Sequence, residues 1–475
     1  MSPSRAEAAP PAPDEYRGGT TIHEWNPEDR DFWERVGSRV AWRNLYCSMP
    51  ALFLAFAVWM VWSTVVVKLN SVGFTFSENQ LFWLAALPGL SGATLRIFYS
   101  FLVPVVGGRN FTVLSTASLL IPAVGMGIAV QNPGTPYWAF VVLALLAGFG
   151  GGNFASSMSN ISFFFPRALK GTALGLNAGL GNLGVSAVQF TAGVVLSIGA
   201  FAFIFGGPQT AEDGEQVYLQ NVSFIWIPLI VLACVAAWFL MNNLATARAS
   251  FSEQAIIFRR KHNWIMCWLY IGTFGSFIGY SAGLALLTRT QFPEVDPLKY
   301  VFLGPLVGAL IRPLGGWLSD KVGGARVTFW NFIVMTAAVF GVIWFLQIKE
   351  QPGAFWGFLA MFILLFATTG VGNGSTFRMV PVIFMTMHEK MLGGAASPED
   401  KAAMQRDAAK ESAAVLGFTS AIGAYGAAVI PLTFGWSIQF TGAPFAALYG
   451  FIAFYISCIV LTWWYYSRKG AEAPC

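Results

Sequence analysis

Three arginines stand within long apolar stretches of the chain: Arg96, Arg312 and Arg378. A guanidinium at the centre of a bilayer costs between about 2.5 and 17 kcal/mol, so it persists only beside a partner or a polar cavity. All 23 Asp and Glu fall in tails, loops or at helix ends, which leaves no carboxylate at that depth. The expected partner is therefore a bound anion, and the planar, permanently charged guanidinium suits a small planar oxyanion.

Arg96 and Arg312 occupy equivalent places in an internal repeat. Each precedes its inner loop by about ten residues, which is roughly 15 Å of helix or half the hydrocarbon thickness. The alternative, in which an arginine snorkels to the inner surface or bonds to backbone carbonyls, is weaker for two at equal depth than for one. Arg378 lies near the inner end of its span and is expected to snorkel. An offset of 216 residues gives the identical pairs Leu87–Leu303, Leu90–Leu306, Gly92–Gly308, Ala93–Ala309 and Arg96–Arg312, and aligns Gly107 and Gly108 with Gly323 and Gly324.

The elements that must hold these arginines are membrane helices. Of 475 residues, 56% are hydrophobic and 11% are charged, against roughly 25% charged in an average soluble domain, which excludes an ordinary water-soluble enzyme. Segments that are apolar on every face also exclude a β-barrel. We predict an all-α polytopic membrane protein with twelve transmembrane helices, at about 49–68, 80–104, 111–130, 136–163, 171–198, 222–244, 262–288, 298–318, 327–347, 354–387, 411–437 and 443–466.

The distribution of basic residues predicts the orientation. If the N-terminus is cytoplasmic, 21 of the 28 Lys and Arg lie in inner segments, four in outer segments and three in spans, so both termini are predicted to be cytoplasmic. Residues 1–40 are expected to be flexible, with a short amphipathic helix around Phe32 to Val40 on the membrane surface, and 389–410 is expected to form a surface helix. The predicted parts are an N-terminal tail (1–45), a six-helix bundle (46–245), a cytoplasmic linker (246–261), a second six-helix bundle (262–467) and a C-terminal tail (468–475).

Glycines concentrate on four spans that are equivalent in the two halves. Small residues let helices approach closely and slide, although tight static packing is the default interpretation of any single glycine. A second offset, of 242 residues, pairs Leu174, Gly175, Gly181 and Gly184 with Leu416, Gly417, Gly423 and Gly426. From this concentration we predict a role in conformational change for Gly151, Gly175, Gly179, Gly417 and Gly423.

Three of these stretches are similar to motifs of a known family. Two resemble the paired signature segments of the nitrate/nitrite porter family of the major facilitator superfamily, and the third resembles the loop motif of the superfamily. The resemblance covers about residues 40–467. The stretches are GFGGGNFASSMSNISFFFPRALKGTALGLNAGLGNLGVSAVQF (148–190), VLGFTSAIGAYGAAVIP (415–431) and ALIRPLGGWLSDKVGGARVT (309–328).

The resemblance implies a fold, a substrate and a set of binding residues. The fold would be the major facilitator fold, with twelve helices in two pseudo-symmetric six-helix halves and the substrate near the midplane between them. Arg96 and Arg312 would hold nitrate or nitrite in a bacterial inner membrane. Asn182 and Tyr270 would donate hydrogen bonds to its oxygens, and Phe56, Phe154 and Phe274 would line the pocket above and below it.

Other classes of membrane protein are less well supported. A redox enzyme would need clustered histidines or cysteines inside the spans, a channel fits the glycine-rich halves poorly, and a sensor is not excluded by the sequence. Proton symport commonly uses an intramembrane Asp, Glu or His. We therefore expect nitrate/nitrite antiport, with proton-coupled nitrate symport as the alternative. We expect no enzymatic activity, cofactor, metal or nucleic acid, the lipid bilayer as partner, and a monomer as the default for this fold.

Overall fold

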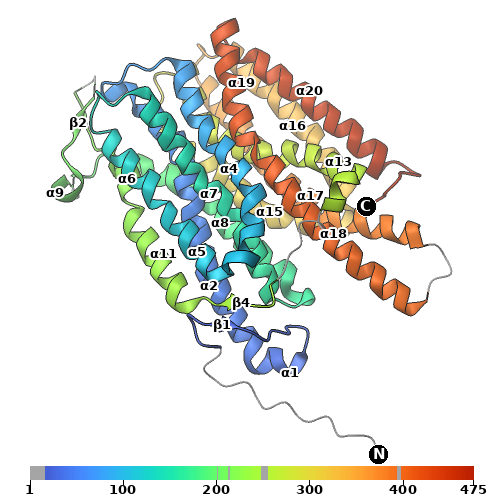
Figure 1. The fold of residues 1–475 in the computed structure, drawn as a ribbon. Helices are drawn as coiled ribbons and strands as arrows, with labels where there is room; N and C mark the ends of the chain where they lie inside the picture. Colours follow the sequence, from blue (N-terminus) through green and yellow to red (C-terminus); the bar gives the residue numbers. More distant parts are fainter. Residues whose placement is uncertain (1–15, 200–201, 212–213, 248–254, 393–396) are drawn as a thin grey trace, which may run out of the picture.

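Twelve helical spans make up most of the computed structural model, which describes residues 16–199, 202–211, 214–247, 255–392 and 397–475. Within these residues, twelve helices are long and apolar enough to cross a membrane, as predicted. The first six form the blue and green part of Figure 1 and the last six form the yellow, orange and red part.

The first half contains α1 (Arg30–Phe32), η2 (Trp33–Gly37), α2 (Ser38–Met60), α3 (Trp62–Lys68), η3 (Asn70–Val72), α4 (Glu78–Val106), α5 (Gly108–Ser118), α6 (Leu120–Ala129), α7 (Tyr137–Phe164), α8 (Arg167–Val195), α9 (Ala202–Phe205), α10 (Asn221–Phe224) and α11 (Ile227–Leu240). The second half contains η5 (Ala255–Arg259), α13 (Lys261–Tyr270), η6 (Ile271–Gly275), α14 (Ser276–Gln291), η7 (Pro297–Lys299), α15 (Leu303–Val322), α16 (Gly324–Gln347), α17 (Ala354–Leu392), α18 (Pro398–Ala424), α19 (Gly426–Thr441), α20 (Phe445–Thr462) and η8 (Trp463–Ser467).

The duplication seen in the sequence is also present in the backbone. Gly107 separates α4 from α5 with φ 91°, and Gly323 separates α15 from α16 with φ 94°. A positive φ of this kind suits glycine, which has no Cβ. The helices that carry the two arginines also pack alike, α4 against α7 and α15 against α17, and each pair meets through facing glycines: Gly92 on Gly151 and Gly308 on Gly370.

The N-terminal segment is more ordered than predicted. Residues 30–60 form one continuous helix, so the expectation of a separate surface helix at 32–40 is wrong, and residues 16–40 are not a loose tail. β1 (Thr21–Ile22) pairs in parallel with β4 (Asn243–Leu244), just before the linker. The apolar face of the early helix packs on the protein's own aromatic rings, with Trp25 against Phe32 and Trp33 against Phe165. Residues 1–15 lie outside the described part.

The charged segment 389–410 does not form a separate surface helix. Its first residues continue α17 as far as Leu392, and from Pro398 onward they belong to α18, which begins with a capping box between Ser397 and Asp400. The end of α17 and the start of α18 therefore extend away from the rest of the molecule, as the orange part of Figure 1 shows. In the outer segment 199–221, β2 (Gln209–Thr210) pairs antiparallel with β3 (Gln216–Val217).

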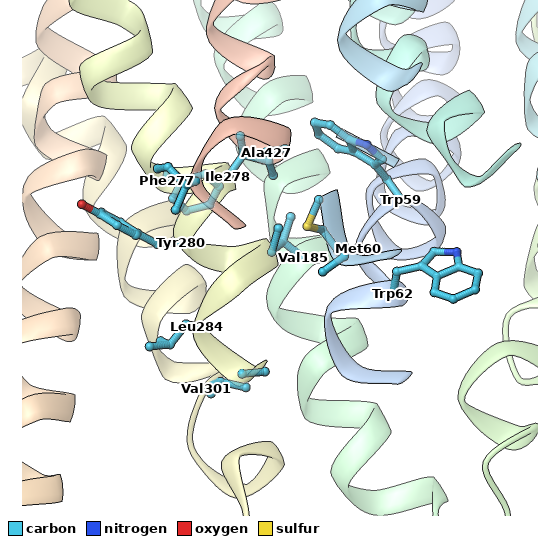
Figure 2. Packing of buried hydrophobic residues seen from close by; sticks show 14 of the residues in the cluster. Trp59, Met60, Trp62, Val185, Phe277, Ile278, Tyr280, Leu284, Val301 and Ala427 are labelled. Atoms are coloured by element: carbon cyan, nitrogen blue, oxygen red, sulfur yellow. The ribbon is translucent and has the colours of Figure 1, made fainter. Parts of the chain in front are cut away.

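The two halves share one hydrophobic core. Figure 2 shows Trp59 and Met60 of α2, Val185 of α8, Phe277 of α14 and Ala427 of α19 within one cluster of buried side chains. Because these helices come from both halves, the apolar seam runs directly between the two repeats. The candidate site lies along this seam.

Candidate functional site

Arg96 is fully buried at the seam, with 1% of its surface exposed. It lies on α4, and its guanidinium is held by two main-chain carbonyls. Nε donates to the oxygen of Gly151 in the same half at 2.8 Å, and Nη1 donates to the oxygen of Ser420 in the other half at 3.1 Å. The third nitrogen, Nη2, is buried and has no hydrogen-bond partner. One donor of the fork is therefore left for a ligand.

Aromatic rings surround the Arg96 guanidinium. Its carbon lies 4.6 Å from the ring centre of Phe154, 5.1 Å from Phe274 and 5.8 Å from Phe56. Trp59, which the sequence analysis did not select, lies at 5.2 Å. Ring faces attract a cation without supplying a negative charge, so they stabilise the guanidinium while leaving it free to bind an anion.

Arg312 occupies the equivalent place on α15 but is less deeply buried. Its Nη2 lies 3.5 Å from the Tyr270 hydroxyl, and its guanidinium carbon lies 5.4 Å from the ring centre of Phe377. Its Nη1 is buried without a hydrogen-bond partner. Each arginine thus presents one buried, unpartnered donor.

No carboxylate neutralises either arginine within the described residues, whose ion pairs involve neither Arg96 nor Arg312. Arg378 differs, because its Nε bonds to a carboxylate oxygen of Asp320 and both side chains are about half exposed. α17 continues for fourteen residues beyond Arg378, as far as Leu392, and the charge of Arg378 is met by this aspartate. The two site arginines are set apart by their lack of such a partner.

Tyr270 and Phe274 are placed by an irregular turn in the seventh span. Between α13 and α14 the chain forms the π-helical turn η6, which widens the helix. The rings of Tyr270 and Phe274 stack at 5.4 Å, and Phe274 in turn stacks on Phe154 of the other half at 6.4 Å. This stack connects the surroundings of Arg312 with those of Arg96.

Asn182 is buried on α8, and its side-chain oxygen has no hydrogen-bond partner. Within the described residues it makes no hydrogen bond or ring contact with the other candidates. A half-turn of the amide exchanges its oxygen for its nitrogen, which could then donate to an anion. Of the predicted residues, the structure thus brings together Arg96, Phe56, Phe154, Phe274, Tyr270 and Arg312 from both halves, and shows Asn182 as a buried amide whose oxygen has no partner.

The five selected glycines have two different environments. Gly151 packs against Trp59 and Gly92, and Gly423 packs against Tyr270, so a side chain at either would collide with the site. Gly175, Gly179 and Gly417 have nothing within 4 Å of where a Cβ would stand. The first group shapes the site, and the second faces open space.

The contacts between the halves show which side of the site is closed. On one side, Lys68 pairs with Asp296 at 3.3 Å, Gln189 donates to the Ser281 carbonyl at 2.8 Å, and Phe190 of α8 meets Phe302, the residue before α15, at 5.1 Å. At the opposite end of the same two helices, Gly171 and Gly175 of α8 and Gly316 of α15 have no neighbour within 4 Å of a Cβ position. The halves are therefore in contact on one side of the site, and these glycines face open space on the other; under the predicted orientation the open side is the inner one.

Sequence reasoning missed three contacts of the two arginines, made by Trp59, Ser420 and Phe377. Trp59 follows Phe56 by three residues on one helix, and such neighbours share a face, so its position was accessible from spacing. Ser420 contributes a main-chain oxygen, which no residue type reveals.

Comparisons with known proteins agree with this architecture. Residues 47–397 match the family model described as Major Facilitator Superfamily. The chain is 51% identical to "Nitrate/nitrite transporter NarU" of Escherichia coli K12, over 94% of this chain and 96% of that protein, and 42% identical to "Probable nitrate/nitrite antiporter NarK2" of Thermus thermophilus, over 96% and 99%. The solved structure of the xylose transporter XylE from E. coli matches with a TM-score of 0.60 at 13% identity, over 90% of this chain and 97% of that one.

Proposed function

Because the chain belongs to the nitrate/nitrite porter family of the major facilitator superfamily, we propose that it exchanges nitrate for nitrite, with the anion held between Arg96 and Arg312. The chain is a multi-pass inner-membrane transporter of nitrate and nitrite and not an enzyme. What is proposed beyond this is the mode of transport, the binding residues and the orientation with both termini in the cytoplasm. We further propose that the functional unit is a monomer, which binds nitrate and nitrite without any cofactor.

The observation that carries the proposal is the pair of buried, unpartnered guanidinium donors. Arg96 Nη2 and Arg312 Nη1 have no hydrogen-bond partner, and no carboxylate within the described residues compensates either charge. A charge in a dry site interacts far more strongly than in water. A small anion between the two donors would satisfy both and reduce the repulsion between the cations.

Exchange follows from the same repulsion. An empty carrier would have to bring two uncompensated cations through the occluded state, whereas a loaded carrier moves with one charge neutralised. In this mechanism nitrate and nitrite each permit reorientation, and return without an anion is slow. Nitrate would enter as nitrite, formed by nitrate reduction in the cytoplasm, leaves.

Proton-coupled nitrate symport is the alternative. The buried carboxylate that the described residues contain is Glu411, in the middle of α18. Arg260 Nε and Nη2 donate to it at 2.6 and 3.2 Å, and His388 lies 2.8 Å from it. Both oxygens of this carboxylate are engaged by Arg260, and it makes no ion pair with Arg96 or Arg312, so among the described residues the substrate site has no carboxylate of its own to carry a proton, which favours exchange.

Counterflow in proteoliposomes tests the exchange. Vesicles preloaded with nitrite are expected to take up labelled nitrate rapidly, and vesicles without internal nitrate or nitrite are expected to take up at least about tenfold less, as an obligatory exchanger requires. The measurement is initial uptake, repeated with a pH gradient imposed on unloaded vesicles. Rapid uptake driven by that gradient alone would contradict antiport, and empty liposomes give the background.

The outer ion pair provides a separate test of alternating access. Lys68→Met and Asp296→Asn are each expected to shift the balance toward the outward-open state by about two- to fivefold, because a partly exposed pair contributes up to about 1 kcal/mol. Spin labels at Asn132 and Lys349, in outer segments of the two halves, would report the change as a longer distance. The swapped pair, Lys68→Asp with Asp296→Lys, should restore the original distribution; an unchanged distribution in both single variants would show that the pair does not hold this side closed.

A further inference from the structure

A second basic pocket lies outside the transport site, at the start of the seventh span. It has a volume of about 340 Å³ and shares no residue with the site around Arg96 and Arg312. It is formed where α13 begins, where α17 ends and where the segment after η8 crosses between them. The lining residues are Arg259, Arg260, Lys261, His262, Met387, Lys390, Met391 and Glu472.

The pocket keeps a surplus of positive charge after its internal pairs are formed. Arg260 is engaged by Glu411, and Lys261 bonds to Glu472 at 2.5 Å, which holds the pKa of the Glu472 carboxyl below its ordinary value. Lys390 bonds to the main-chain oxygen of Glu472, and among the described residues neither Lys390 nor the exposed Arg259 forms an ion pair. Two cations are thus left without a carboxylate.

The backbone adds to the positive charge of the pocket. α13 starts at Lys261 and continues through η6 and α14 to Gln291, and no side chain caps its first turn. The N-terminus of a long helix carries a partial positive charge and free amide donors. The arrangement of α13, Arg259 and Lys390 therefore favours a group with a negative charge and several acceptor oxygens.

Aromatic side chains place the pocket at the level of lipid headgroups. Trp264 on the first turn of α13 and Trp463 and Trp464 on η8 are each about half exposed, and the Arg468 guanidinium stacks on Trp464 at 4.2 Å. Tryptophan gathers at the boundary between hydrocarbon and water. Two methionines, Met387 and Met391, give the pocket an apolar wall beside its cations.

We propose that this pocket binds the phosphate group of an anionic phospholipid headgroup, with Arg259 and Lys390 as the principal contacts. The phosphate oxygens fit a basic pocket at the end of a membrane helix, and the methionine wall fits the start of an acyl chain. Free phosphate offers the same oxygens without the chain. The bound lipid would anchor the start of the helix that carries Tyr270 and Phe274. The proposal concerns binding and does not depend on the mode of transport.

Binding to the purified full chain in neutral detergent tests the proposal. Phosphatidylglycerol is expected to raise the thermal unfolding temperature, with phosphatidylcholine and inorganic phosphate giving no comparable rise at matched concentration. The double variant Arg259→Gln, Lys390→Gln is expected to bind phosphatidylglycerol on the order of thirtyfold more weakly, from about fivefold per basic residue. The matched control, Lys401→Gln with Arg406→Gln, removes two exposed cations of α18 outside the pocket and should bind as the unmodified protein does.

Three outcomes would overturn the proposal. Equal stabilisation by inorganic phosphate would assign the pocket to a free anion and not to a lipid. Equal loss in both double variants would show general attraction to the basic face, and unchanged affinity in the pocket variant would show that the lipid binds elsewhere. When a variant is too unstable for melting curves, native mass spectrometry can instead compare how much phosphatidylglycerol remains bound to the pocket variant and to the control variant.

Discussion

Arg96→Lys is expected to lower nitrate uptake by about 10- to 150-fold although the charge is kept. In the structure one guanidinium donates to Gly151 and Ser420 and keeps Nη2 free. An ammonium has one nitrogen and lacks the planar fork, so it cannot reach both carbonyls and the anion in this geometry. The range corresponds to the roughly 1.5–3 kcal/mol of one hydrogen bond to a charged group. Arg312→Lys should behave similarly, because its fork spans the Tyr270 hydroxyl and a free donor.

The measurement is counterflow in vesicles, with the amount of inserted protein quantified. Arg378→Lys is the matched control, since Arg378 lies on a span but is paired with the exposed Asp320, and it should keep most of the activity. Near-normal uptake by either site variant would remove the two-arginine site. If Arg378→Lys lost as much uptake as the site variants, the assay would be responding to any arginine replacement in a span and not to the two-arginine site.

Gly175→Leu is expected to abolish transport while leaving the protein folded. Nothing lies within 4 Å of its Cβ position in the structure, so the side chain fits there, and leucine favours a helix over glycine by up to about 1 kcal/mol. Closing the inner side must bring α8 toward α15, because the two helices already touch at Phe190 and Phe302 and separate inward. A leucine on the open surface would block that movement and hold the carrier inward-open. Gly417→Leu on α18 should act in the same way.

Gly450→Leu separates the effect of added bulk from the effect of its position. Gly450 on the exposed surface of α20 also has no neighbour within 4 Å, but α20 packs on α16 in its own half. Its leucine variant should transport normally and melt at a similar temperature. Normal counterflow in Gly175→Leu would mean that the open glycines of α8 play no part in closure, and a large drop in its melting temperature would point to a folding defect.

The sequence predicted the fold through two kinds of pattern. Long apolar runs located the twelve spans, and the offset of 216 residues identified the duplication that Gly107 and Gly323 confirm in backbone geometry. The order of residues 16–40 was missed because it depends on pairing Thr21 with Asn243, over 200 residues away, which leaves no periodicity in the local sequence. The segment 389–410 was misjudged because charge indicates exposure to water but does not mark where a membrane helix ends.

The site was predictable to the extent that side-chain chemistry determines it. An arginine in an apolar span without a carboxylate is visible in the sequence, and the structure places Arg96 in such surroundings. The roles of Phe56, Phe154 and Phe274 came from resemblance alone, since 43 phenylalanines make any one of them unremarkable. The carbonyl of Ser420 and the split of the glycines into packed and open groups depend on tertiary packing, which no residue type encodes.

The two arginines are equivalent in the repeat but not in their surroundings. Arg96 is enclosed by four rings and tied to both halves, whereas Arg312 is partly accessible and faces a tyrosine hydroxyl presented by a π-helical turn. The proposed binding site is therefore asymmetric, although the helices that form it are related by the repeat. In the proposed exchange, the anion would meet two arginines with unequal surroundings, so we expect substitutions around Arg96 and around Arg312 to change the half-saturating concentrations of the two faces by different amounts.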